Sequence, residues 1–264
     1  MRTAIEDLDV ALSGRTVVSG VRIMAEEGEI AGLVGPNGSG KSTVLRTVYR
    51  HLRPHAGRVL VGGADIRALT AVQSARQVAA LPQERGTDFE LSVREVVAMG
   101  RTPYKRAFAG EDPTDGDAVA AALDQVGMAG GGAAAVLRAV RRRAPARAAG
   151  PGARPGPEGA GAGRADEPSG RAPPGGAAGP VAPRHRRTTL LAIHDLNAAA
   201  SVCDRLHVLH GGKVVASGTP REVLTAGLLA EVFGVRAAVV DHPLTGDPLI
   251  AFDHRAPVFP VSGR

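Results

Sequence analysis

The sequence predicts an α/β fold with a mainly parallel sheet flanked by helices. Strand-like and helix-like segments alternate towards both ends of the chain, as in a parallel sheet covered on both faces. Residues 30–34 (IAGLV) and 188–193 (TTLLAI) are short, continuous apolar runs, the pattern of strands buried on both sides. The 264 residues, 44% of them hydrophobic, suffice for one large domain or two small ones.

The first half of the chain shows regular alternation. Strands are predicted at residues 15–24, 29–34, 58–61 and 77–81. The helical spacing of Val44, Leu45 and Val48 predicts a helix over 41–51. Further helices are predicted at 92–99 and 117–126.

Order returns after residue 187. A strand at 188–193 is followed by a helix at 196–203 and a strand at 205–209. Gly211 and Gly212 then predict a hairpin turn into a strand at 213–216.

Residues 129–187 break this pattern. Of these 59 residues, 50 are Ala, Gly, Pro or Arg, with very few large apolar side chains. Such a segment cannot bury enough surface to offset its chain entropy, so we predict that it is disordered as written.

The same segment carries the positive charge of the chain. It has 11 arginines against three acidic residues, which leaves about −2 for the rest of a chain whose net charge is +6. No aromatic residues interleave with these arginines. We therefore expect no nucleic-acid partner, although a basic protein would otherwise suggest one.

A glycine-rich motif lies between the strand at 29–34 and the helix at 41–51. It matches GxxxxGK[ST] in full, in the strand–loop–helix context that the motif requires. Its residues are Gly35, Pro36, Asn37, Gly38, Ser39, Gly40, Lys41, Ser42 and Thr43. Glycines let backbone N–H groups and a helix N-terminus approach a polyphosphate, which a turn that merely caps a helix would not need.

The motif assigns a role to each polar side chain. Lys41 is predicted to reach the β- and γ-phosphates, Ser42 to ligate Mg²⁺, and Thr43 to support the α-phosphate side. The sequence therefore predicts ATP and Mg²⁺ as ligands of a P-loop NTPase.

Three further segments resemble the ATP-binding subunits of ABC transporters. They are AALPQE with Gln83, LSVREVVAMGRTPY (91–104) and LLAIHDLNAAASVCDRL with His194. The second resembles importers of iron-siderophores, haem or cobalamin. The resemblance implies that Gln83 contacts Mg²⁺ and the attacking water and that His194 contacts the γ-phosphate. Asp195 would orient that loop or reach a partner subunit.

The resemblance also implies an architecture and partners. The chain would be one ABC ATPase domain, 1–264, with a nucleotide-binding core at 1–85 and 188–255. A helical subdomain would begin at 86–128 and be disrupted by 129–187. Two copies would pair head to tail at the cytoplasmic face of the membrane, bind an integral membrane permease, and act indirectly with a substrate-binding protein.

The sequence departs from this family in two ways. No aromatic residue stands at Ala11, Leu12 and Ser13, where a ring would stack on adenine, so stacking is in doubt and apolar contact stays open. The LSGGQ/E signature and the apolar strand ending in Asp-Glu are also missing. Asp166 and Glu167 follow no such strand, and we interpret them as coincidence.

A shifted reading frame accounts for the second departure. When suitable synonymous codons are written for residues 140–144 and read one base out of frame, they encode Leu-Ser-Gly-Gly-Glu. Residues 163–169 treated in the same way encode Leu-Asp-Glu-Pro. The two motifs lie 23 positions apart, which is the spacing that the family requires. We interpret residues 129–187 as frame-shifted, through either a sequencing error or a genuine double frameshift. The alternative for the chain as written is an ATP-binding protein deficient in hydrolysis.

The remaining reactive residues read as structural. Cys203 is the single cysteine, which excludes an internal disulfide framework, and we expect a buried, inert thiol. The histidines outside the motifs lack metal-ligand spacing and are expected to be solvated: His207, His210, His242 and His254.

Overall fold

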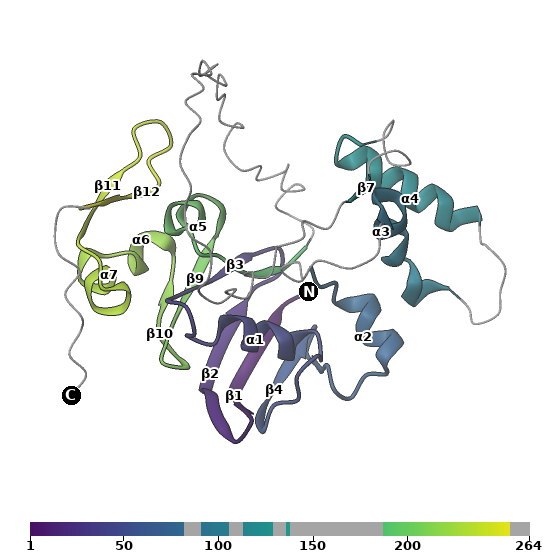
Figure 1. Cartoon of the computed structure of the whole chain (residues 1–264), viewed down its shortest axis with the longest axis horizontal. Helices are drawn as coiled ribbons and strands as arrows, with labels where there is room; N and C mark the ends of the chain where they lie inside the picture. Colours follow the sequence, from purple (N-terminus) through teal and green to yellow (C-terminus); the bar gives the residue numbers. More distant parts are fainter. Residues whose placement is uncertain (82–90, 106–112, 129–135, 138–186, 254–264) are drawn as a thin grey trace, which may run out of the picture. The chain divides into compact units, whose positions relative to one another are not determined.

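The computed structural model describes residues 1–81, 91–105, 113–128, 136–137 and 187–253, which fall into two units (Figure 1). One unit comprises Met1–Leu81, Thr102–Ala107 and Ala182–Arg264. The other comprises Pro82–Arg101 and Phe108–Val181. Gln83 lies outside the described residues, as does the segment 129–187 except for 136–137 and Arg187.

The centre of the first unit is a four-stranded sheet in the order β10-β9-β3-β8. Strand β3 (Ile30–Val34) is buried at all five residues and pairs in parallel with β8 (Thr189–Ala192) and β9 (Arg205–His210). Strand β10 (Lys213–Gly218) returns antiparallel to β9 after the predicted glycine turn. The predicted α/β fold, with β3 flanked by parallel strands, is confirmed.

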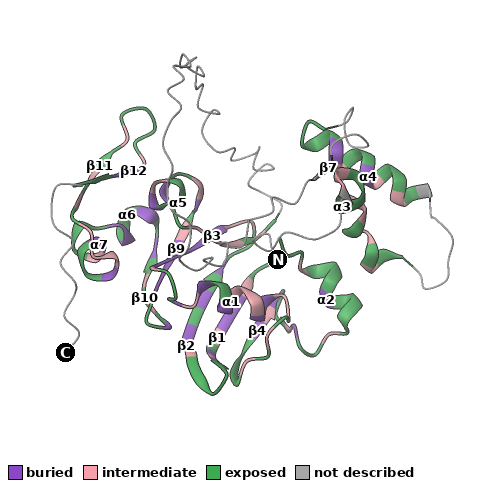
Figure 2. Cartoon of the chain, viewed as in Figure 1, coloured by how far each residue is buried: buried purple, intermediate pink, exposed green. Residues whose placement is uncertain are grey.

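Both faces of this sheet carry a hydrophobic core. The buried residues of the chain are coloured purple in Figure 2. Leu33 and Leu209 belong to one core, together with helix α1 (Lys41–Val48). Val34 and Leu206 belong to the other, which includes helices α5 (Leu196–Val202) and α7 (Ala226–Phe233). Alternate residues of each strand thus point to opposite faces, so the apolar runs in the sequence are buried on both sides.

A second, antiparallel sheet joins the first core, with strands in the order β2-β1-β4-β5. Its strands are β1 (Thr3–Leu12), β2 (Arg15–Ala25), β4 (Ala56–Val61) and β5 (Ala64–Asp65). Strand β1 was not predicted from the sequence. Its register shifts between Ile5 and Leu8 and again between Leu8 and Val10, which breaks the alternation that marks a strand.

The predicted strand at 77–81 is wrong. Helix α2 (Ala71–Gln77) covers its first residue, Val78 to Ala80 form no strand, and the Leu81 side chain is fully exposed. Strand β8, although apolar, is only half-buried, because among the described residues it pairs with β3 alone. A parallel strand of this composition needs a neighbour on each side, and that neighbour is not found in the described part of the chain.

The end of the first unit is a small α/β appendage. Helix α6 (Pro220–Val223) and helix α7 lead into the antiparallel hairpin of β11 (Ala237–Asp241) and β12 (Pro248–Phe252). Ile250 of β12 is buried in the same core as α5. A short 3₁₀ helix, η1 (Thr102–Tyr104), also belongs to this unit.

The second unit contains two of the predicted helices. They are α3 (Val93–Met99), which begins at a capping box formed by Ser92 and Glu95, and α4 (Pro113–Gln125). A short pair of strands, β6 (Leu91–Ser92) and β7 (Val136–Leu137), accompanies them. None of the helices described in either unit combines the length and apolar character that a membrane crossing requires.

Candidate functional site

The candidate site is built on the turn between β3 and α1. Gly35 follows β3 with φ of 149°, and a Cβ at this position would collide with the carbonyl oxygen of Leu209. Gly40, with φ of 105°, is the N-cap of α1 and packs against Val17 and Val18 of β2. These positions require glycine, since the loop wraps tightly between neighbouring backbones and delivers free N–H groups to the start of the helix.

Lys41 is folded back over this loop. Its side chain is 5% exposed, and Nζ donates hydrogen bonds to the carbonyl oxygens of Gly35 (2.7 Å) and Pro36 (2.8 Å) and, more weakly, to Ser39 Oγ (3.4 Å). Burial lowers the pKa of the Lys41 ammonium. The loop therefore holds a cation whose hydrogen bonds are to neutral groups, an arrangement suited to attract phosphate oxygens.

The other polar residues of the loop differ in accessibility. Asn37, Gly38 and Ser42 are exposed, whereas Thr43 is buried. The Ser42 hydroxyl on the first turn of α1 is thus accessible to a metal ion bound beside a phosphate. Thr43 has only 7% exposure, which leaves its contact with a phosphate a prediction.

His194 lies at the same edge of the sheet as this loop. Leu33 of β3 pairs with Ala192 of β8, and Gly35 and His194 each follow two residues later on neighbouring parallel strands. The backbone N–H of Ile193 donates to Leu33 O at 3.1 Å, which fixes this register. The exposed side chain of His194 therefore emerges at the carboxyl edge of the strands, where open α/β sheets bind ligands.

Asp195 organises the backbone that follows His194. It is the N-cap of α5, and its Oδ1 accepts hydrogen bonds from the N–H groups of Asn197 (2.9 Å) and Ala198 (3.1 Å). This geometry supports the predicted loop-orienting role of Asp195.

The sequence missed how the loop is supported. The turn between β9 and β10 braces it, since Gly212 lies against Gly40 and its carbonyl oxygen accepts from Ser19 N at 2.9 Å. Val17 and Val18 border the loop, while Leu12, at the β1–β2 turn opposite Arg15, is 36% exposed. Val17 and Val18 reach the loop because β2 lies beside the β9–β10 turn, a contact between distant parts of the chain that the sequence did not reveal.

No metal site is complete among the described residues. They contain no group of three or more His, Cys, Asp or Glu side chains that could hold a metal ion. Of the Mg²⁺ ligands predicted from the sequence, Ser42 is described and Gln83 is not, so this site stays a prediction.

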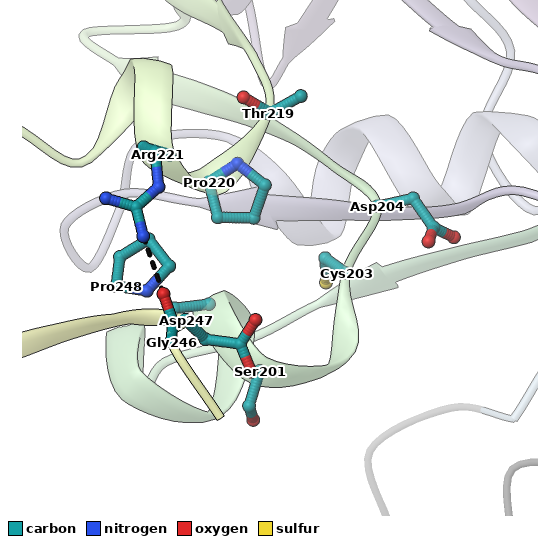
Figure 3. Close-up of a pocket in the computed structure, with 10 residues that line it drawn as sticks. Ser201, Cys203, Asp204, Thr219, Pro220, Arg221, Gly246, Asp247 and Pro248 are labelled. Carbon is teal, nitrogen blue, oxygen red and sulfur yellow. Dashed lines mark hydrogen bonds between the residues drawn. The ribbon is translucent and has the colours of Figure 1, made fainter. Parts of the chain in front are cut away.

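A separate pocket of about 340 Å³ lies between α5, α6 and the β11–β12 turn (Figure 3). It is bordered by Asp204, Arg221 and Asp247, and no residue of the glycine-rich loop lines it. Cys203 also borders it, and burial, helped by the nearby Asp204 carboxylate, raises the pKa of its thiol to about 12. The expected inert cysteine is thus supported.

The expectation that His207 is solvated is wrong. Its side chain is 3% exposed, with Nδ1 2.7 Å from Ser217 Oγ and Nε2 3.0 Å from Met24 O. His207 therefore links the central sheet to β2 of the antiparallel sheet.

Known proteins are similar to this chain in sequence. The ABC transporter family model matches residues 18–144. The hemin import ATP-binding protein HmuV of Pseudomonas fluorescens is 35% identical over 261 residues, covering 92% of this chain and 97% of that protein. The cobalamin import ATP-binding protein BtuD of Halobacterium salinarum is 34% identical over 263 residues, covering 93% of this chain but only 62% of that longer protein.

Solved structures of low identity share the fold. A metal-chelate type ABC transporter in an inward-facing conformation aligns with 95% of this chain and 96% of its own, at a TM-score of 0.61 and 14% identity. An ATP-bound bacterial Atm1-family ABC exporter aligns with 87% of this chain and 41% of its own, at a TM-score of 0.57 and 18% identity.

Proposed function

The chain belongs to the family of ABC transporter ATP-binding proteins, an ABC-type ATPase by family, and we propose that it energises the import of haem, cobalamin or a related iron-siderophore. The observation that carries the use of ATP in this proposal is the loop at residues 35–43, braced by β2 and the β9–β10 turn around the buried Lys41. The names of the similar proteins from Pseudomonas fluorescens and Halobacterium salinarum support the class of cargo.

Each residue of the site has its own role in the proposed phosphoryl transfer. Backbone N–H groups of the loop and the start of α1 would bind the phosphates, and Lys41 would turn from its carbonyl partners to the β- and γ-phosphates. Ser42 and Gln83 would hold Mg²⁺, which supplies charge neutralisation on the phosphate oxygens. His194, at the same sheet edge, would contact the γ-phosphate.

The proposal includes partners. A second copy would pair head to tail with this one, and both would bind a membrane permease at the cytoplasmic face of the membrane, with a substrate-binding protein acting indirectly. The names of the similar import ATP-binding proteins support association with a membrane permease.

We further propose that hydrolysis depends on the sequence that the other reading frame encodes in place of residues 129–187. The half-buried, apolar β8 supports this proposal, because among the described residues it has a neighbouring strand on one side only, and an apolar strand is expected on the other. The regrouped codons encode Leu-Asp-Glu-Pro, the expected end of such a strand, and its Asp and Glu would assist Mg²⁺ and polarise the attacking water.

Purified protein from two genes tests the proposal. One encodes the chain as written, and the other carries compensating single-base changes near codons 129 and 187. Phosphate release should rise by about 10²–10⁴ in the second protein, the usual contribution of a positioned catalytic group. Lys41→Ala in that protein should abolish the gain.

Each result separates the alternatives. ATP binding without turnover in the first protein, with turnover in the second, supports both the ATPase function and the frame shift. Equal turnover in the two proteins would refute the frame proposal. Turnover that Lys41→Ala leaves unchanged would refute the role of the loop.

A further inference from the structure

The side-chain amide of Asn197 on helix α5 forms hydrogen bonds with the C-terminal hairpin. Asn197 Nδ2 donates to Ile250 O at 3.1 Å, and Ile250 N donates to Asn197 Oδ1 at 2.7 Å. The amide thereby satisfies both backbone groups of one β12 residue, as a neighbouring strand would. Ile250 is 3% exposed, so its backbone groups have little access to water if Asn197 is removed.

This contact lies three residues after His194. On one side, the segment is fixed to β3 by the hydrogen bond from Ile193 N to Leu33 O. On the other side, Asp195 caps α5, and Asn197 holds the first turn of that helix against β12. His194 itself is exposed, so its position is set by these backbone anchors on either side.

We infer that Asn197 is a positioning residue that holds His194 at the carboxyl edge of the sheet through the C-terminal hairpin. The inference rests on the proposed function, because it assumes that His194 contacts bound nucleotide. It extends that function by making β11 and β12 part of the support of the site.

A second anchor keeps the hairpin in place. Arg221 on α6 donates from Nη2 to Gly246 O at 2.6 Å, seen as the dashed line in Figure 3, and pairs with Asp241 Oδ1 at 2.8 Å. The hairpin is thus attached to α6 near its turn and to α5 at β12. Loss of Asn197 should loosen the attachment of β12 to α5, where the buried Ile250 still packs, while the Arg221 anchor persists.

The ring signals of His194 report the effect directly. Nuclear magnetic resonance of the ¹⁵N-labelled full chain, assigned with His194→Gln, is recorded with and without Mg²⁺ and a non-hydrolysable ATP analogue. In the unaltered protein the analogue should shift the His194 ring signals. Asn197→Ala should lose most of that shift, while the dissociation constant of the analogue changes by less than about threefold, because the loop at 35–43 still binds the phosphates.

Two further variants sharpen the test. Asn197→Asp keeps the acceptor for Ile250 N–H and should recover part of the shift, which also secures the test if Asn197→Ala does not fold. Ser201→Ala is the matched control, because its hydroxyl donates to Ala198 O within the same helix and to no other group in the described part of the chain, and it should behave as the unaltered protein.

Three outcomes overturn the inference. In the first, Asn197→Ala keeps the His194 shift while faster hydrogen exchange at Ile250 N–H shows that the contact is broken. That outcome would contradict the positioning role of Asn197 and leave the proposed function standing. Bound analogue without any His194 shift in the unaltered protein would contradict the role of His194 as well. No binding of the analogue would refute the proposed nucleotide site itself.

Discussion

Acidification should destabilise this fold through His207. Burial, with a smaller contribution from the nearby Arg205 charge, holds the pKa of this imidazole below its usual value near 6.5. Between its pKa in the folded and in the unfolded chain, the unfolded state binds more protons, so stability falls as pH falls. The contribution is therefore fully present above about pH 6.5 and is lost as pH falls through the folded-state pKa.

The size of the effect follows from the burial and contacts of the ring. At pH 5.5, one unit below the unfolded value, a ring that stays neutral in the fold costs up to about 1.4 kcal/mol of stability. Protonation would put a second N–H opposite the Ser217 hydroxyl, which must then turn from donor to acceptor, and a charge at the contact with Met24. The junction between the two sheets is the place where this cost arises.

Urea unfolding at pH 7.5 and 5.5 measures the contribution of His207 to the pH dependence of stability. His207→Gln should lower the free energy of unfolding at pH 7.5 by about 1–2 kcal/mol, because a hydrogen-bonded buried group is lost. The same substitution should reduce, by about 1.4 kcal/mol, the difference in the free energy of unfolding between pH 7.5 and pH 5.5. His210→Gln, at an exposed position on the same strand, is the control and should keep the original pH dependence. Parallel pH profiles for the original protein and His207→Gln would refute the reasoning.

Further substitutions test the packing around the site. Gly35→Ala would place a Cβ against a backbone carbonyl of β9, and this variant should lose ATP binding in a titration. A Cβ at Gly38 would meet nothing within 4 Å, so Gly38→Ala should cost only about 1–2 kcal/mol of stability, from its positive φ. Gly32→Ala would bring a Cβ to 2.7 Å from the Cys203 sulfur and should lower the free energy of unfolding by about 1–3 kcal/mol. In a double-mutant cycle measured by urea unfolding, adding Cys203→Ala should recover part of this loss. Full additivity of the two changes would contradict the contact. Asp195→Ala should lower the free energy of unfolding by about 1 kcal/mol through loss of the α5 N-cap, and an unchanged urea midpoint would contradict the cap.

The sequence predicted the parts of the site whose signals are local. The apolar run of β3, the glycine loop and the start of α1 are contiguous, and the backbone geometry of the loop requires the glycines that mark it. Strands β8 and β9 were also predicted, and the alternation of strands with helices predicted their parallel arrangement.

Long-range contacts explain what the sequence did not predict. Strand β1 is interrupted by register shifts, and its residue Asp7 has a positive φ of 47°, so its apolar residues do not alternate regularly. The burial of His207 depends on Met24, which is distant in the chain. The predicted strand at 77–81 follows an apolar pattern, but a strand also needs neighbours, and the described residues provide none for it.

Calorimetric titration of the full chain with Mg²⁺ and ATP tests the central claim most directly. The account predicts saturable binding at one site per chain, weakened at least about tenfold by Lys41→Ala, since a charge-assisted contact to phosphate contributes about 1.5–3 kcal/mol. No binding by the unaltered chain, or equal affinity in the two proteins, would contradict the claim that the loop at residues 35–43 is a nucleotide site.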